Sequence, residues 1–123
     1  MGDKRVIPIL LKTLKETQEL SPRLEFTEVW SDEKVISTAN VWEDWDISAL
    51  VPSFVKAVLV TIHTATVVAI VVGARKDGSA LDRKLALGEN ATFTLLVECS
   101  ASRIIEIWGS ATNGKFRISG YWS

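Results

Sequence analysis

The strongest constraint on the fold of this chain is a series of short segments in which apolar and polar residues alternate. Successive side chains of a β-strand point to opposite faces of the sheet, so alternation predicts strands that bury one face. In the final segment, Phe116, Ile118 and Trp122 are expected on one face and Tyr121 on the other. The segments with this pattern are Ala57 to Thr64, Ala91 to Cys99 and Lys115 to Trp122.

Turn-forming dipeptides separate the predicted strands. Asp77-Gly78 and Asn113-Gly114 are strong hairpin signals, because glycine accepts the positive φ angles that tight turns require. Short strands at this spacing predict an all-β fold, an antiparallel β-sandwich of jelly-roll type with about eight strands. Further strands are expected at Leu24 to Trp30, Val35 to Val41, Trp42 to Ile47, Leu81 to Leu87 and Arg103 to Trp108.

The chain is expected to consist of an N-terminal extension, residues 1–22, and one β-sandwich domain, residues 23–123. A length of 123 residues suits a single domain with its own core. The extension is compatible with a short helix, which Ser21-Pro22 would end. It is equally compatible with an edge strand at Val6 to Leu11 that Pro8 interrupts. Both interpretations stay open.

Charge and cysteine content exclude several classes of function. The formal net charge is -1 and the isoelectric point is about 5.8, so no basic field is available to hold the phosphates of a nucleic acid. The single cysteine, Cys99, excludes an intramolecular disulfide and a thiolate metal cluster. The apolar run Val6 to Leu11 is too short for a signal peptide. We therefore predict no nucleic-acid partner and no signal peptide.

One long apolar stretch, Phe54 to Ala74, raises the alternative of a membrane span. Lys56, His63 and several threonines interrupt it, and its first half alternates. Thr64-Ala65-Thr66 offers a turn midway. Two core strands explain the stretch better than one helix, so we predict no membrane partner.

No arrangement of reactive residues predicts catalysis. His63 is the only histidine and is expected to be a hydrogen-bonded structural or interface residue. A catalytic triad needs a base beside its nucleophile and a group that orients the base, and the sequence shows no such partner for His63. Gly73, Gly78 and Gly88 are too dispersed for a phosphate-binding loop. We therefore predict no catalytic residue, no metal and no cofactor, and we do not expect an enzyme.

An acidic group at Glu43, Asp44 and Asp46 is a weaker candidate for chemistry. Paired carboxylates can hydrolyse glycosides or bind calcium. Asp44 and Asp46 are expected to share a strand face, and no calcium-binding loop pattern surrounds them. A solvated or salt-bridged strand explains this group better.

Aromatic residues are the main candidates for an interface or a ligand site. Five tryptophans in 123 residues are an excess, and their rings can fill a core, cover a subunit interface or stack on sugars. The alternation favours core or interface, and a carbohydrate-binding module with glycan as partner is the alternative. The candidate residues are Trp30, Trp42, Trp45, Trp108, Trp122 and Tyr121.

Three stretches of the second half resemble a known class of protein. The first runs from Trp42 to Pro52 (WEDWDISALVP) and continues into Lys56 to Val60, the second is Arg75 to Ser79 (RKDGS), and the third runs from Arg103 to Trp122. Together they resemble jelly-roll modules of phage and prophage virion proteins, such as tail-fibre or decoration domains. The resemblance covers about residues 42–123. It implies a structural, virion-associated protein, commonly a trimer, and it brings no functional residue.

Apolar residues outside the expected core predict self-association. Val71 and its neighbours from Val67 to Val72 leave no polar face, and Leu96 and Trp108 fall opposite the main apolar sets of their strands. Monomers seldom expose such a patch, and closed symmetric oligomers are the usual way to bury it. We therefore expect a homo-oligomer. The resemblance implies three copies, and a dimer stays open.

Overall fold

The computed structural model describes residues 24–64 and 69–123. The N-terminal extension predicted at 1–22 lies outside the described residues, as do Val67 and Val68. The described part is all-β, as predicted from the alternation, and it holds no helix long and apolar enough to cross a membrane.

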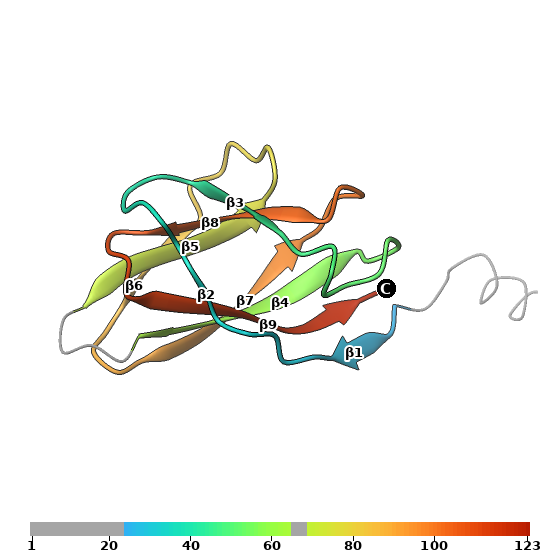
Figure 1. Cartoon of the computed structure of the whole chain (residues 1–123), viewed down its shortest axis with the longest axis horizontal. Coiled ribbons are helices and arrows are strands. Elements are labelled where there is room, and N and C mark those ends of the chain that lie inside the picture. The colour runs from blue at the N-terminus through green and yellow to red at the C-terminus, as the bar shows by residue number, and fades with distance from the viewer. Residues whose placement is uncertain (1–23, 65–68) are drawn as a thin grey trace, which may run out of the picture.

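Within the described residues, nine antiparallel strands form two sheets that pack face to face (Figure 1). The first sheet has the order β1-β9-β4-β7, with β2 also paired to β9, and the second has the order β3-β8-β5-β6. The strands are β1 (Phe26–Glu28), β2 (Lys34–Val35), β3 (Glu43–Asp46), β4 (Ala57–Thr64), β5 (Ile70–Lys76), β6 (Lys84–Leu87), β7 (Thr92–Glu98), β8 (Ile104–Gly109) and β9 (Gly114–Trp122).

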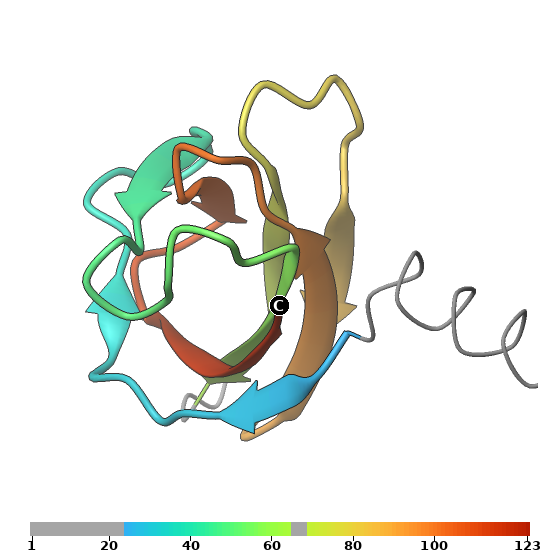
Figure 2. The same cartoon turned by 90° about the vertical axis from the view of Figure 1, so that its right-hand side faces the viewer.

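The pairing identifies the sandwich as a jelly roll. Strand β2 pairs with β9, β3 with β8, β4 with β7 and β5 with β6. These four pairs describe one long antiparallel ribbon that is folded over at the β5–β6 end and wrapped into two sheets. Seen roughly along the strands, the two sheets enclose the core (Figure 2).

The structure confirms the alternation of buried and outward-facing residues predicted for β4. Val58, Val60 and Ile62 are fully buried between the sheets, while the residues between them face outward. From the second sheet, Ile105 and Ile107 are buried against them. Burial of such aliphatic side chains contributes about 1.5–3 kcal/mol each, so these interior faces supply much of the driving force for folding.

A β-bulge in β9 overturns one part of the predicted pattern. Leu59 lies opposite Gly120, but Val60 lies opposite Ile118, so Ser119 is an extra residue that reverses the faces beyond it. Tyr121 consequently packs against the core. Trp122 lies on the outer face, where its ring packs against that of Phe26 with centroids 4.6 Å apart and an angle of 55° between the ring planes. The prediction that Trp122 shares a face with Ile118 was wrong.

The strands near the start of the domain are shorter than predicted. Only Phe26–Glu28 and Lys34–Val35 form strands here. The residues between and after them are fixed by other hydrogen bonds and by a turn in the backbone. Ser31 is buried and exchanges hydrogen bonds with the backbone of Ile118. Asn40 adopts a φ of 63°, which ends the extended backbone predicted up to Val41.

Candidate functional site

Two tryptophans cover the outer face of the second sheet. Gly73 of β5 has no side chain, and the ring of Trp42 lies 3.1 Å from the position that a Cβ there would occupy. The guanidinium of Arg75 lies 3.9 Å from the Trp42 ring centroid, and the ammonium of Lys84 lies 4.0 Å from that of Trp108. Trp108 is therefore 9% exposed within a single chain. The expectation that it leaves apolar area uncovered was wrong.

The other candidate aromatics differ sharply in exposure. Trp45 faces the core and is 8% exposed, whereas Trp30, in the connection between β1 and β2, is 66% exposed. Trp122 and Tyr121 are half-buried, on the outer face and against the core respectively. Trp30 is the one tryptophan whose ring lies mostly in solvent.

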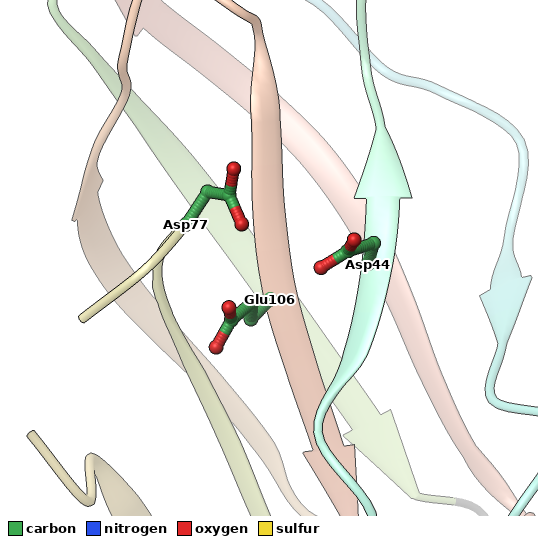
Figure 3. A group of neighbouring side chains, drawn as sticks. All are labelled: Asp44, Asp77 and Glu106. Carbon is green, nitrogen blue, oxygen red and sulfur yellow. The ribbon is translucent and has the colours of Figure 1, made fainter. Parts of the chain in front are cut away.

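Three carboxylates meet beside the covered face of the second sheet. Asp44 of β3, Glu106 of β8 and Asp77, which follows β5, point toward one another (Figure 3). Their oxygens lie within 4.8 Å of one another, a spacing that could hold a hard cation. However, Glu106 already accepts hydrogen bonds from Arg75 Nε at 2.6 Å and from the Gly78 amide at 3.1 Å. Glu106 is therefore already paired with Arg75, and the carboxylates of Asp44 and Asp77 lie beside that ion pair. That the protein binds no metal stays a prediction.

Glu106 is the most enclosed of these acids, with a side chain that is 13% exposed. Burial opposes its ionisation, but the hydrogen bonds from Arg75 and from the Gly78 amide outweigh burial and hold the pKa of Glu106 below its ordinary value of 4.5. A carboxyl group whose pKa is lowered on folding stabilises the folded state above its ordinary pKa. That contribution disappears as the pH falls through the folded pKa.

Replacing Glu106 with Gln is therefore expected to destabilise the protein at neutral pH by about 2 kcal/mol, because the charge-assisted bond to Arg75 is lost. The difference from wild type should shrink as the pH falls below 4.5 and through the lowered pKa of Glu106 in the folded state, because the wild-type carboxyl group then becomes protonated too. Urea denaturation at neutral pH and in that acid range measures it. Glu98→Gln is the matched control, because the Glu98 side chain is 72% exposed and its pair with Lys76 should contribute less than about 1 kcal/mol. An equal loss at both pH values would contradict this assignment.

The remaining predicted acids have local structural roles. Glu43 accepts hydrogen bonds from the hydroxyl and the amide of Ser37 and lies 3.7 Å from Lys34 Nζ. These contacts, led by the Ser37 hydroxyl, lower the pKa of Glu43. Asp46 accepts a hydrogen bond from the Ser48 amide at 2.9 Å, which lowers the pKa of Asp46. Only Asp44 joins the acidic cluster, and it shares an outward face with Asp46 as predicted.

A hollow of about 300 Å³ lies on the outer face of the first sheet, and we call it the Trp30 groove. Its floor comes from β4, β7 and β9, and its wall comes from the connection between β1 and β2. Trp30 and His63 were predicted candidates from the sequence, but the charged members were missed, although the outward alternation of Lys115 and Arg117 was a visible signal. The lining residues are Trp30, Glu33, Thr61, His63, Thr92, Lys115 and Arg117.

Arg117 organises the wall of the Trp30 groove. It donates to Ser31 O at 2.6 Å and to Glu33 Oε1 at 3.0 Å, and its guanidinium lies 4.9 Å from the Trp30 ring centroid. Lys115 Nζ lies 3.3 Å from the other oxygen of Glu33. The hydrogen bond from Lys115, followed by that from Arg117, lowers the pKa of Glu33 despite some loss of solvation. Glu33 is therefore ionised at neutral pH.

The floor of the groove is a set of hydrogen-bonded side chains. His63 Nδ1 lies 2.9 Å from Thr92 Oγ1, and Thr61 donates to Ser119 Oγ at 2.9 Å. His63 is thus a hydrogen-bonded residue, as expected. His63 and Thr92 supply an imidazole and a hydroxyl, but a catalytic triad also needs a third group that orients the imidazole. That this chain has no catalytic activity stays a prediction.

The sandwich is open on one side, between β6 and β7. A cavity of about 270 Å³ lies there, lined by inward residues of both sheets that include Ile62, Val72 and Phe93. Leu85 lies opposite Val72 and therefore faces inward, yet it is 42% exposed. Interior side chains thus reach solvent along this side, which we call the open seam.

Comparison with known proteins gives a distant structural likeness. No protein-family model matches the chain, and no curated protein matches its sequence. The solved structure of the coat protein of Tobacco streak virus is similar over 80% of this chain and 83% of that chain. The sequence identity is 13% and the TM-score is 0.44. At this identity the likeness concerns the fold and says nothing of a ligand or partner.

Proposed function

We propose that this protein is a non-enzymatic structural module that assembles with copies of itself through the edge of β7 and the open seam. The observation that carries the proposal is the outer edge of β7, which pairs with no further strand of residues 24–64 and 69–123. The resemblance of residues 42–123 to jelly-roll modules of virion proteins supports a virion-associated role for the assembly.

The edge of β7 carries few of the devices that normally keep strand edges apart. Such edges usually carry charged residues, prolines or bulges, since unpaired backbone groups attract further strands. From Thr92 to Val97 the strand holds no charged residue and no proline. Arg83 donates to Leu96 O at 3.0 Å, so the backbone of Leu96 points away from β4 and toward the open edge. Thr94 presents its backbone groups in the same direction, because these alternate along a strand.

Exposed leucines on both sides of this edge add apolar surface. Leu96 is 52% exposed on the outer face of the first sheet, where it lies beside Leu59. Leu85 is 42% exposed at the open seam, and Leu81, in the connection between β5 and β6, is 66% exposed. A second copy would pair with the free edge and cover both groups of leucines, which fits the mixture of main-chain and apolar contacts in strand addition.

Two symmetric arrangements use this surface. Antiparallel pairing of β7 with its counterpart gives a two-fold dimer. Contact between the β7 edge of one copy and the β6 side of the next gives a ring that can close with three copies. The resemblance to trimeric virion modules favours the ring, and light scattering in dilute buffer gives the number directly.

Replacing Leu96 with Lys is expected to convert the oligomer into a monomer of 13.6 kDa at micromolar concentration. The lysine places a charge on the edge, which is the protection that natural edge strands use. Size-exclusion chromatography with light scattering measures the mass. Phe54→Lys is the matched control, because Phe54 is 64% exposed but lies between β3 and β4, away from the edge. A wild-type monomer, or an oligomer unaffected by Leu96→Lys, would refute this interface.

Carbohydrate binding is the second candidate function. The observation that favours it is the Trp30 groove, which combines a solvent-exposed ring with hydroxyl, imidazole and charged groups in one hollow. This groove and the open seam are lined by different residues, so the two functions can coexist.

A further inference from the structure

We propose that the Trp30 groove binds glycans that carry a carboxylate, such as sialylated or uronic-acid oligosaccharides. This rests on the second candidate function above and adds the site and the chemical class of the sugar. Three features of the groove carry it: the aromatic platform, the charge balance and the fixed polar floor.

The platform is a ring that the fold holds in solvent. Trp30 is 66% exposed, although the next residue, Ser31, is 7% exposed. Ser31 anchors the connection to β9, since its amide donates to Ile118 O at 3.1 Å and its hydroxyl accepts from the Ile118 amide at 2.9 Å. A large apolar ring kept in water by a fixed backbone is available to stack on the apolar face of a sugar.

The charge of the groove is positive in a protein whose net charge is -1. Lys115 and Arg117 share a single carboxylate, that of Glu33, at 3.3 and 3.0 Å. One surplus positive charge therefore remains. The Lys115 side chain is 42% exposed, so its ammonium is accessible to a ligand. A ligand with one carboxylate would complete the neutralisation and gain a charge-assisted hydrogen bond.

The floor offers polar groups that are already oriented. His63 and Thr92 are held by their mutual contact of 2.9 Å, and Thr61 by its bond to Ser119. Sugars present several hydroxyl groups. Hydroxyl and imidazole side chains can both donate to and accept from them, and a carboxylate accepts from them. Because these side chains are ordered before the ligand arrives, little entropy is lost on binding. The volume of about 300 Å³ is at the lower end for ligand pockets and suits a mono- or disaccharide.

A single-stranded nucleic acid is the other ligand that a tryptophan beside Lys and Arg could serve. Such binding combines stacked bases with a positive groove that tracks several phosphates. The Trp30 groove has one surplus positive charge, which suits one carboxylate better than a polyanion.

The first experiment is a glycan array that carries sialylated and uronic-acid oligosaccharides beside their neutral counterparts, followed by calorimetric titration of the tightest acidic glycan in solution. We expect wild type to bind acidic glycans at least several-fold more tightly than the neutral counterparts. Trp30→Ala should weaken binding roughly tenfold or more, because the stacking surface is lost. Lys115→Gln should weaken acidic glycans and leave the weaker neutral ones unchanged. Phe54→Ala, an exposed aromatic outside the groove, should bind as wild type does.

The outcomes separate this inference from the function on which it rests. Binding of neutral glycans alone, with dependence on Trp30, overturns the charge assignment and keeps carbohydrate binding. Absence of any glycan binding, or binding that Trp30→Ala leaves unchanged, overturns both. Tighter binding of a short oligonucleotide than of every acidic glycan overturns both in favour of nucleic acid. Circular dichroism of each variant verifies that the fold is retained.

Discussion

Replacing Phe116 with alanine is expected to lower the free energy of unfolding by about 3–5 kcal/mol. Phe116 is the largest of the fully buried side chains among the described residues, at 0% exposed. It lies in β9, opposite Ile62 of β4 on one side and Lys34 of β2 on the other. Truncation removes the ring from the centre of the first sheet and leaves a cavity that the rigid strands cannot close.

Urea denaturation followed by circular dichroism measures the effect of Phe116→Ala. The matched control is Phe54→Ala, the same substitution at a residue that is 64% exposed, which should change stability by less than about 0.5 kcal/mol. A loss of similar size in both variants would mean that Phe116 does not fill the core as described.

The interior of the sandwich was predictable because it obeys a local rule. In β4 every second residue is buried, so the period of two can be recognised in the sequence without knowing which strands pair with β4. The hairpin predicted at Asp77-Gly78 joins β5 to β6, which pair, and Gly78 adopts a φ of 75°. The hairpin predicted at Asn113-Gly114 was wrong, because β8 and β9 belong to different sheets and the turn there crosses from one sheet to the other. Strand type and facing follow from such short-range information.

The extra residue at Ser119 was not predictable from the same rule. A β-bulge depends on how β9 pairs with β4, and nothing in the alternation of Lys115 to Trp122 marks the shift. The bulge exchanges the faces of Tyr121 and Trp122, so one unforeseen residue misplaced two candidate site residues. Which face a residue near a strand end occupies can therefore be predicted only when the pairing register of the strand is known.

The burial of Trp108 was missed for a related reason. Its side chain does lie on the outer face, as the pattern predicted, but Lys84 of β6, which is two strands away across Gly73 of β5, lies over it. Trp42 similarly lies over Gly73 on the same face. Charged residues with long apolar stems can cover aromatic rings, and which ring they cover is decided by tertiary contacts.

The Trp30 groove could be predicted only in part. Trp30 and His63 were candidates by type, but Glu33, Lys115 and Arg117 belong to segments far apart in the sequence. They meet because β9 pairs with both β2 and β4. The sequence predicts that each strand has a polar outward face. That these faces line one hollow could be predicted only from the order of the strands in the sheet.

Replacing Gly73 with alanine is expected to destabilise the protein by about 1–3 kcal/mol or more, although it adds only one methyl group. A Cβ at this position would lie 2.4 Å from the backbone oxygen of Arg83, which cannot rotate away. It would also lie 3.1 Å from the ring of Trp42 and 3.2 Å from Lys84 Cγ. The pairing of β5 with β6 must therefore shift, and Trp42 must lift from the sheet and lose its contact with Arg75.

Gly88→Ala is the matched control, because no atom lies within 4 Å of the Cβ that it would add. That variant should be unchanged or more stable by up to about 1 kcal/mol, through the smaller conformational freedom of its unfolded chain. Thermal and urea denaturation compare the two variants, and a change in tryptophan emission for Gly73→Ala alone would report the movement of Trp42. A Gly73→Ala variant as stable as wild type would contradict the close approach of β6 and Trp42 to β5. Equal losses in both variants would assign the effect to the loss of glycine itself rather than to the cover over the second sheet.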